Sequence, residues 1–158
     1  MSLHPISTNQ RTSGIDLFQS VHRQANLAGL VERLLGRYEP LADFNNLGSV
    51  QSKGRTYLGL QTIPLQQVSG SVNRQGDFDR HFRPLRRHLR DRWVNIFMQM
   101  QTDGWEPVKL YKVWNSYYVV DGHHRVSVAL TSGRQFIEAE VWEYGRQPSY
   151  FEVGIPAT

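Results

Sequence analysis

The N-terminal part of the chain carries apolar residues at the spacing of a helix. Residues 1–12 are polar and are predicted to be disordered. From Ser13 to Gly36 the apolar positions recur every three or four residues, which places them on one side of a helix. Ser13 is suited to cap this helix and Gly36 to end it, while Gly29 favours a break in the middle. The pattern predicts a packing face and no chemistry.

A loop, two extended segments and a second helix follow along the chain. Residues 45–54 are rich in Asn, Ser and Gly, which predicts a loop. Residues 57–63 and 65–68 have the residue types of strands, and Pro64 between them favours either a strand start or an edge position. A second helix is predicted to open at Pro84, and its apolar residues fall on one face.

The last third of the chain has the most regular pattern. Residues 108–113 and 117–120 are predicted to be strands joined by a turn at Asn115-Ser116. A short helix over residues 124–132 follows. Residues 136–142 then alternate between apolar and polar side chains, which predicts a third strand with one face turned inward.

The order of these elements predicts an α+β fold in which short helices cover a small mixed sheet. We expect an N-terminal helical extension over residues 1–55, a main domain over residues 56–145 and a C-terminal tail over residues 146–158. Of the 158 residues, 39% are apolar and 20% are charged, which is typical of one globular domain.

The sequence also predicts where the protein resides. No apolar run approaches the roughly 18 to 20 residues that span a bilayer. The segment from Met1 to Ser7 lacks the pattern of a secretory signal. We therefore expect a cytoplasmic protein with no membrane partner.

Two features of the composition narrow the chemistry. The chain has no cysteine, which excludes disulfides, thiolate catalysis and cysteine metal sites. The net charge of +4 is local, because residues 74–92 contain seven Arg and only three Asp. Such a cluster predicts a phosphate-bearing partner, either a nucleotide or a nucleic acid backbone; the alternative is a solvated helix face.

The run Asp121-Gly122-His123-His124-Arg125 lies where a predicted strand meets a predicted helix. The first N–H groups of a helix have no partner within it, and its dipole favours anions there. Gly122 lets the backbone approach a ligand without a Cβ clash, and Arg125 carries a planar fork suited to phosphate. His123 and His124 can donate hydrogen bonds or move a proton, and Asp121 could hold a metal ion or a substrate hydroxyl.

This run has a structural alternative, in which Asp121 caps the helix and both histidines are surface residues. Adjacent helical residues point about 100° apart, so His123 and His124 are not expected to bind one metal ion together. A nucleophilic triad is not expected, because no serine lies in a nucleophile elbow and there is no cysteine. Together the five residues favour a ligand site.

A second group of charged residues precedes the second helix. Its members are Arg74, Arg80, His81 and Arg83, alternating with Asp77 and Asp79, and several of them could converge on a phosphate or a metal ion. We expect the three arginines to form a second wall of the phosphate pocket. The alternative is a solvated region with local ion pairs.

The sequence from Glu106 to Val113 and from Tyr117 to Val126 resembles the ParB/sulfiredoxin superfamily. In that family a strand ends in a glycine turn, and a Gly-x-x-Arg element that opens a helix binds nucleotide phosphates. Residues 63–68 resemble the family's opening strand and residues 136–142 its closing strand. The resemblance covers about residues 57 to 143.

The branches of this superfamily differ in their chemistry. Sulfiredoxins have a catalytic cysteine in the turn where this chain has His123, so sulfinate reduction is not expected. Partition-type members grip DNA through a helix-turn-helix, for which the residues after the last strand leave no room. The turn is most similar to that of free serine kinases, which transfer phosphate from a nucleotide to a small hydroxyl compound. Other members are described as nucleases.

The leading hypothesis is a nucleotide-phosphate-binding protein, either a phosphotransferase or a nucleotide hydrolase, that uses ATP, ADP or CTP with Mg²⁺. The backbone of Gly122, His123 and His124 would hold the phosphates together with the side chain of Arg125. Asp121 would bind Mg²⁺ or orient a hydroxyl acceptor, and His123 or His124 would stabilise charge on the transferred group. The remaining wall of the pocket would be formed by Arg74, Arg80 and Arg83.

Two alternatives belong to other functional classes. The first is a module that binds or cuts DNA through Arg86, Arg87 and Arg90, which lie off the apolar face of the second helix. The second is a scaffold that keeps the fold without catalysis.

Overall fold

The chain begins with one long helix, α1 (Ile6–Leu34), in the computed structural model, which describes residues 6–145. Helix α1 starts seven residues before Ser13, so the predictions of a disordered start through residue 12 and of a cap at Ser13 are wrong. The Ser13 hydroxyl instead donates to the Asn9 carbonyl at 3.0 Å, one turn back in the same helix. Gly29 does not break the helix, because an isolated glycine costs only about 1 kcal/mol.

Only the first part of α1 is a packing face. Gly14 lies against Val94 and Phe97, so closely that a Cβ there would come within 2.9 Å of the Phe97 ring. Phe18 is buried in the same interface. This contact with the second long helix accounts for the early start of α1. The apolar stripe continues beyond Ala25, but there its residues are exposed: Leu27, Leu30, Val31, Leu34 and Leu35.

Short elements connect α1 to the sheet. These are strand β1 (Ala42–Asp43), the 3-10 segment η1 (Phe44–Lys53), strand β2 (Arg55–Pro64), the 3-10 turn η2 (Leu65–Gln67) and strand β3 (Val68–Ser71). The predicted loop over residues 45–54 is therefore largely 3-10 helical. The Asp43 carboxylate accepts the Asn45 N–H at 2.8 Å at its start, and buried Phe44 and Val50 anchor it to the sheet.

The second long helix, α2 (Arg90–Gln101), begins later than predicted. Pro84 does not open it: Pro84 pairs with Phe78 in an isolated β-bridge, and the Leu85 N–H donates to the Asp77 carbonyl at 2.9 Å. These contacts hold the backbone extended at Pro84. A 3-10 turn, η3 (Arg87–Leu89), then leads into α2.

The C-terminal elements agree closely with the predicted order. They are β4 (Val108–Val113), β5 (Ser116–Asp121), α3 (His123–Thr131) and β6 (Phe136–Tyr144). Ile137, Ala139 and Val141 are buried, as the alternation in β6 predicts. The predicted tail over residues 146–158 lies outside the described residues.

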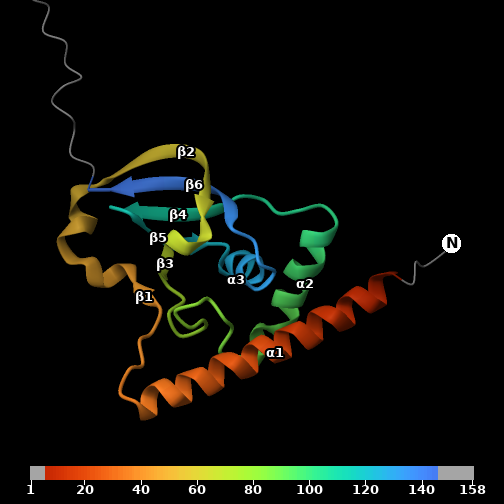
Figure 1. The fold of residues 1–158 in the computed structure, drawn as a ribbon. Coiled ribbons are helices and arrows are strands. Elements are labelled where there is room, and N and C mark those ends of the chain that lie inside the picture. The colour runs from red at the N-terminus through yellow and green to blue at the C-terminus, as the bar shows by residue number, and fades with distance from the viewer. Residues whose placement is uncertain (1–5, 146–158) are drawn as a thin grey trace, which may run out of the picture.

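The six strands form one mixed sheet in the order β1-β3-β5-β4-β6-β2 (Figure 1). Strands β3 and β5 are parallel, as are β1 and β3 and also β4 and β6, while β4 and β5 and also β2 and β6 are antiparallel. Strand β2 lies at one edge, which confirms the edge position predicted from Pro64. The α+β class with a small mixed sheet and an N-terminal helix is also confirmed.

Different elements pack on the two faces of the sheet. Val108 and Leu110 face the main core, where α2, α3 and the first part of α1 pack. Tyr111 and Val113, from the alternate positions of β4, lie with the η1 side chains on the opposite face. No helix within residues 6–145 is long and apolar enough to cross a membrane.

Trp93 joins α2 to α3 at the centre of the main core. Its indole Nε1 donates to the Ser127 hydroxyl at 2.9 Å, and both residues are fully buried. A buried hydroxyl that loses its partner keeps the cost of its desolvation. This bond therefore fixes the separation of the two helices that border the site described below.

Replacing Trp93 by Phe should lower the free energy of unfolding by about 1–3 kcal/mol, because Ser127 loses its donor and a void remains. Urea denaturation measures this loss. Trp114→Phe is the control, since the Trp114 side chain is 74% exposed. Equal losses for the two variants would contradict this assignment of the Trp93 bond.

Candidate functional site

The candidate site lies where the carboxyl ends of β3 and β5 meet the start of α3. Because these two strands are parallel neighbours, their carboxyl ends emerge at the same edge of the sheet, the position at which α/β sheets commonly hold ligands. A cavity of about 160 Å³ opens there. Its lining comes from the end of β3, from α2 and from the β5–α3 turn: Asn73, Arg74, Arg92, Ile96, Val120, Asp121, Gly122, His123, His124 and Arg125.

Gly122 has a left-handed backbone, with φ of 100°, between β5 and α3. A Cβ at this position would lie 2.5 Å from Val108 Cγ1 and 2.9 Å from Val108 Cβ. Glycine is therefore required by both the backbone angle and the packing on β4. We expected Gly122 to make room for a ligand, but the side from which a Cβ is excluded faces Val108 of the core.

The first turn of α3 keeps backbone N–H groups without a cap. Gly122 is the N-cap residue and supplies no side chain, and the first bond within the helix runs from the Val126 N–H to the Gly122 carbonyl at 3.0 Å. The alternative in which Asp121 caps the helix is wrong, because its carboxylate bonds to Arg125 instead. The amides of His123, His124 and Arg125 are thus available at the positive end of the helix dipole.

Arg125 holds the turn in place with three hydrogen bonds. Its Nη1 donates to the carbonyls of Glu106 at 2.7 Å and Pro107 at 3.1 Å, and its Nη2 donates to the Asp121 carboxylate at 2.9 Å. A guanidinium has five N–H donors, so two of them stay available. Arg125 therefore lines the cavity and also ties α3 to the chain just before β4.

Ser71 fixes the proton position on His123. The Ser71 hydroxyl oxygen accepts the N–H groups of Asn73 at 3.2 Å and Arg74 at 2.9 Å, which occupy its two lone pairs. Its own proton must then be donated to His123 Nε2, which lies 2.7 Å away. His123 is consequently a neutral imidazole whose proton is on Nδ1.

His124 has an unpaired polar atom inside the protein. Its Nε2 is buried and has no hydrogen-bond partner within the described part of the chain. Its ring meets the Phe78 ring edge-on, with centroids 5.4 Å apart. Both histidines are more than nine-tenths buried, so the alternative that they are surface residues is wrong. An orphaned buried nitrogen beside a cavity is a group that a ligand could satisfy.

Burial and nearby arginines lower the pKa of both histidines to about 4. For His123, desolvation is the largest cause and Arg74 the next; for His124, desolvation is followed by Arg92 and Arg74. Both imidazoles are therefore neutral at pH 7. Arg74 and Arg92, which disfavour a proton on these rings, also favour an anion in the cavity.

The cations nearest this cavity are Arg74 and Arg92. Arg74 pairs with Asp77 at 2.9 Å and keeps 47% of its side chain exposed. Arg92 is exposed and has no hydrogen bond or ion pair to any residue from 6 to 145. Sequence reasoning placed Arg74 here but missed Arg92 and Ser71. Arg92 and Ile96 are one turn apart on α2, yet only the packing of α2 against α3 brings them to the turn.

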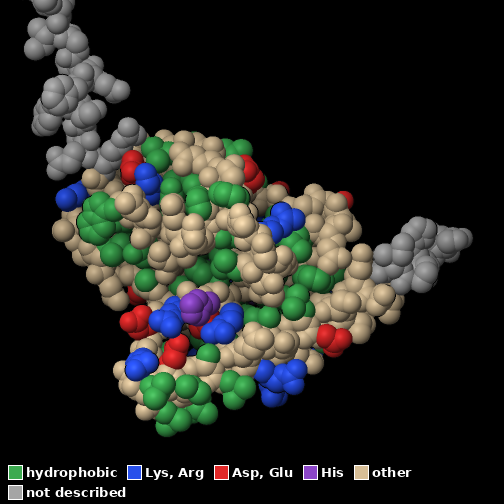
Figure 2. All heavy atoms as spheres, in the orientation of Figure 1, with side chains coloured by type: hydrophobic (Ala, Val, Ile, Leu, Met, Phe, Trp, Pro, Cys, Tyr) green, Lys and Arg blue, Asp and Glu red, His purple; other side chains and the backbone are tan. Residues whose placement is uncertain are grey.

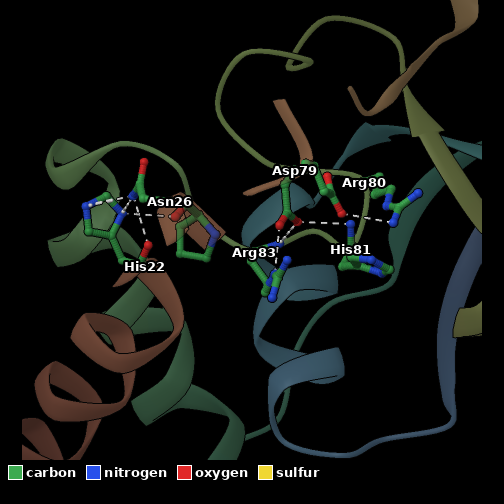
Figure 3. Close-up of polar contacts among 8 residues, drawn as sticks. His22, Asn26, Asp79, Arg80, His81 and Arg83 are labelled. Atoms are coloured by element: carbon green, nitrogen blue, oxygen red, sulfur yellow. Dashed lines mark hydrogen bonds and ion pairs between the residues drawn. The ribbon is translucent and has the colours of Figure 1, made fainter. Parts of the chain in front are cut away.

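Arg80 and Arg83 do not line this cavity, so the expectation that they form its second wall is wrong. Arg83 Nε donates to the buried Asp79 carboxylate at 2.7 Å, within the tight turn drawn in Figure 3. Arg80 reaches Glu32 on α1 at 3.0 Å and Glu39 at 3.3 Å. For these two arginines the alternative of local ion pairs is confirmed, because each has an acidic partner within reach.

The cavity has few acidic residues in its lining. Among the residues that the structure describes, Asp121 is the one carboxylate lining the cavity, and its side chain is 57% exposed. No group of three or more His, Asp or Glu within residues 6–145 is arranged to hold a metal ion. A metal ion bound by Asp121 would thus need its other ligands from outside this group of side chains.

Comparisons with known proteins give one structural similarity. The crystal structure of sulfiredoxin from Arabidopsis thaliana is similar to this chain with a TM-score of 0.40 and 17% identity, over 52% of this chain and 82% of that one. It belongs to the superfamily that the sequence resembles. No protein-family model and no curated protein matches the sequence.

Replacing Gly122 by Ala should destabilise the protein for two reasons. The left-handed backbone costs about 1–2 kcal/mol with any Cβ, and the clash with Val108 adds about 1–3 kcal/mol. Gly133→Ala is the matched control, because Gly133 has φ of 75° but open space around it. Thermal or urea unfolding compares the two, and a loss at Gly122 no larger than at Gly133 would refute the packing role.

Stability should fall as the pH drops from 6.5 towards 4. The unfolded chain takes up protons on these histidines near their ordinary pKa of 6.5, while the folded chain does so only near 4. Each imidazole contributes on the order of 3 kcal/mol to this loss.

The variant His124→Gln isolates this effect in urea titrations at several pH values. It should flatten the dependence of unfolding free energy on pH between 6.5 and 4. His81→Gln, which removes an exposed histidine, serves as the control. An unchanged slope in His124→Gln would show that His124 is not held neutral.

Proposed function

We propose that the cavity at the start of α3 binds a phosphate group of a nucleotide, and that the protein is a phosphotransferase or nucleotide hydrolase. The observation that carries this proposal is a cavity lined by the uncapped first turn of α3, by Arg74 and Arg92, and by His124, whose buried Nε2 has no hydrogen-bond partner within the described residues. Backbone amides and an imidazole nitrogen, which are costly to leave unpaired, line one cavity together with two positively charged arginines. A phosphate supplies several acceptor oxygens and negative charge, and satisfies both conditions.

The size of the cavity favours a phosphate group over a complete nucleotide within it. Its volume of about 160 Å³ is far above the roughly 10–15 Å³ that one water needs. It is well below the roughly 300–1,000 Å³ of pockets that enclose whole small ligands. The phosphate would therefore enter the cavity while the nucleoside stays outside it.

The donors around the cavity suit the oxygens of a phosphate. The amides of His123, His124 and Arg125 are directed along the helix axis, and His123 offers its Nδ1 proton. Arg125 has two remaining N–H donors, and Arg74 and Arg92 bring positive charge from the loop after β3 and from α2. Because the imidazoles are neutral, the positive charge comes from the arginines alone at pH 7.

Asp121 is the residue that we assign to the reaction. Its exposed carboxylate at the rim can accept a hydrogen bond from a hydroxyl acceptor or from water. Mg²⁺ is commonly held by one or two carboxylates together with substrate phosphates, so Asp121 would hold the Mg²⁺ that a nucleotide brings. That ion would offset phosphate charge. Phosphoryl transfer depends mainly on such positioning and charge stabilisation.

The DNA-binding or nuclease alternative would use a different set of arginines. Arg86 and Arg87 precede α2, and Arg90 begins it; none of the three lines the phosphate cavity. They border a groove that also exposes leucines of α1. Phosphate backbones make no use of exposed leucines, so these arginines lend DNA binding less support than the cavity lends to a nucleotide.

Calorimetry with ATP, ADP and CTP, each with and without Mg²⁺, tests the proposal. Replacing Arg92 by Gln should weaken the binding about ten- to hundredfold, because a charge-assisted bond to phosphate is worth roughly 1.5–3 kcal/mol. Arg37→Gln removes an exposed arginine just after α1 and is the control. Asp121→Asn should lower turnover far more than it lowers affinity.

Two results would end the proposal. One is the absence of binding by any of these nucleotides at millimolar concentration. The other is equal affinity in Arg92→Gln, His124→Ala and the Arg37→Gln control. Binding without phosphate release or transfer would instead identify the non-catalytic scaffold.

A further inference from the structure

A groove runs between α1 and the segment that leads into α2. Two adjoining hollows of about 910 and about 350 Å³ form it, and they share His22, Arg23 and Arg87. One wall is α1 and the other is the segment over residues 85–90. Within the described chain, no residue of this groove also lines the phosphate cavity.

The floor of the groove includes leucines that solvent reaches. Leu27 is 63% exposed and Leu30 is 54% exposed, and both lie near Leu85 from the opposite wall. Val31 and Leu34 continue the stripe along α1, which gives the spacing of one helix face. Figure 2 shows the hydrophobic side chains gathered at this end of α1. An exposed apolar stripe of this kind marks an interaction surface.

The rim of the groove is basic. Arg23, Arg86, Arg87 and Arg90 border it, and no Asp or Glu of residues 6–145 appears in its lining. Arg90 contacts Asp91 at 3.2 Å, whereas Arg23 and Arg87 form no ion pair within the described residues. Among residues 6–145, Arg23 and Arg87 thus have no acidic partner, and Leu27 and Leu30 stay exposed.

One hydrogen bond joins α1 to the chain just before the opposite wall, and a second lies within α1. His22 Nδ1 donates to the Pro84 carbonyl at 3.0 Å, and Asn26 Nδ2 donates to the His22 carbonyl at 2.9 Å (Figure 3). His22 also stacks on Phe18, with ring centroids 5.6 Å apart. These contacts hold the groove in shape before a partner arrives, which lowers the entropy cost of binding.

We propose that this groove binds an acidic amphipathic helix of a partner protein. Leucines on α1 would contact the apolar face of that helix, and its acidic flanks would meet the arginines on both walls. The groove extends along α1 from Phe18 to Leu30, which is about 18 Å or three turns of helix. A partner segment of three to four turns matches this length.

Two other occupants fit the groove less well. A second copy of the chain would bring the same arginines against each other, and their repulsion opposes that pairing. Duplex DNA would meet the arginines but would leave the leucines exposed beside its phosphates. An acidic amphipathic helix complements both the charge and the apolar surface.

Fluorescence anisotropy with the full chain tests this assignment. The probe is a labelled synthetic peptide with leucines at helical i, i+3 and i+7 positions and glutamates elsewhere, and a scrambled peptide of equal composition is its reference. Saturable binding that weakens with salt is expected for the first peptide only.

Variants then separate the apolar and the charged contributions. Leu27→Asn with Leu30→Asn should weaken binding at least about tenfold, while Leu60→Asn, at a leucine that is 60% exposed on β2, should not change it. Arg23→Gln with Arg87→Gln should weaken binding and reduce its salt dependence. Arg92→Gln should leave peptide binding unchanged, which keeps this test separate from that of the phosphate cavity.

Five outcomes would overturn the proposal. These are no binding of the peptide, equal binding of the scrambled peptide, and equal affinity after the leucine substitutions. The fourth is a dimer in light scattering that Leu27→Asn dissolves, which would assign the groove to a second copy. Binding of duplex DNA that needs the arginines but not the leucines would likewise assign it to nucleic acid.

Discussion

The site depends on the close contact between the backbone of Gly122 and the side chain of Val108. This contact allows β5 to end in a left-handed turn so that α3 can begin directly over the core. Any Cβ at Gly122 would move the first turn of α3, and with it the amides and both imidazoles. Arg125 reinforces the same geometry through its bonds to the carbonyls of Glu106 and Pro107. The turn is therefore fixed from the β4 side before any ligand is bound.

Burial of polar groups is the cost of this arrangement. His123 recovers a hydrogen bond from Ser71, but His124 Nε2 recovers none within the described residues, and both rings lie near arginines that disfavour their protonation. Such unsatisfied groups persist where the surrounding core is strong enough to hold them. Here that core includes Phe78, which contacts both imidazole rings, and Trp93, which ties α2 to α3. Ligand binding would relieve a cost that folding has imposed.

The sequence predicted the last third of the fold well because its patterns are local. The alternation in β6 and the β5–α3 junction depend on neighbouring residues, and both were found. The start of α1 and that of α2 were not, because Gly14 packs on α2 and Pro84 is held by a bridge to Phe78. The turn at Gly122 was located from the sequence because its pattern is local. The residues that surround this turn in the fold were only partly predicted. Ser71 and Arg92 reach it through strand pairing and helix packing, which no local pattern encodes.

The arginine cluster between residues 74 and 92 shows why charge in a sequence does not map onto one surface. Three environments divide it. Arg74 and Arg92 border the cavity at the start of α3, and Arg80 and Arg83 are paired with carboxylates around the Asp79 turn. The other three, Arg86, Arg87 and Arg90, border the groove with α1. The alternating extended, turn and helical backbone of this segment directs successive arginines to different sides. Arg74 and Arg90 also have acidic partners, so the unpaired charge within residues 6–145 is that of Arg92 at the cavity and of Arg86 and Arg87 at the groove.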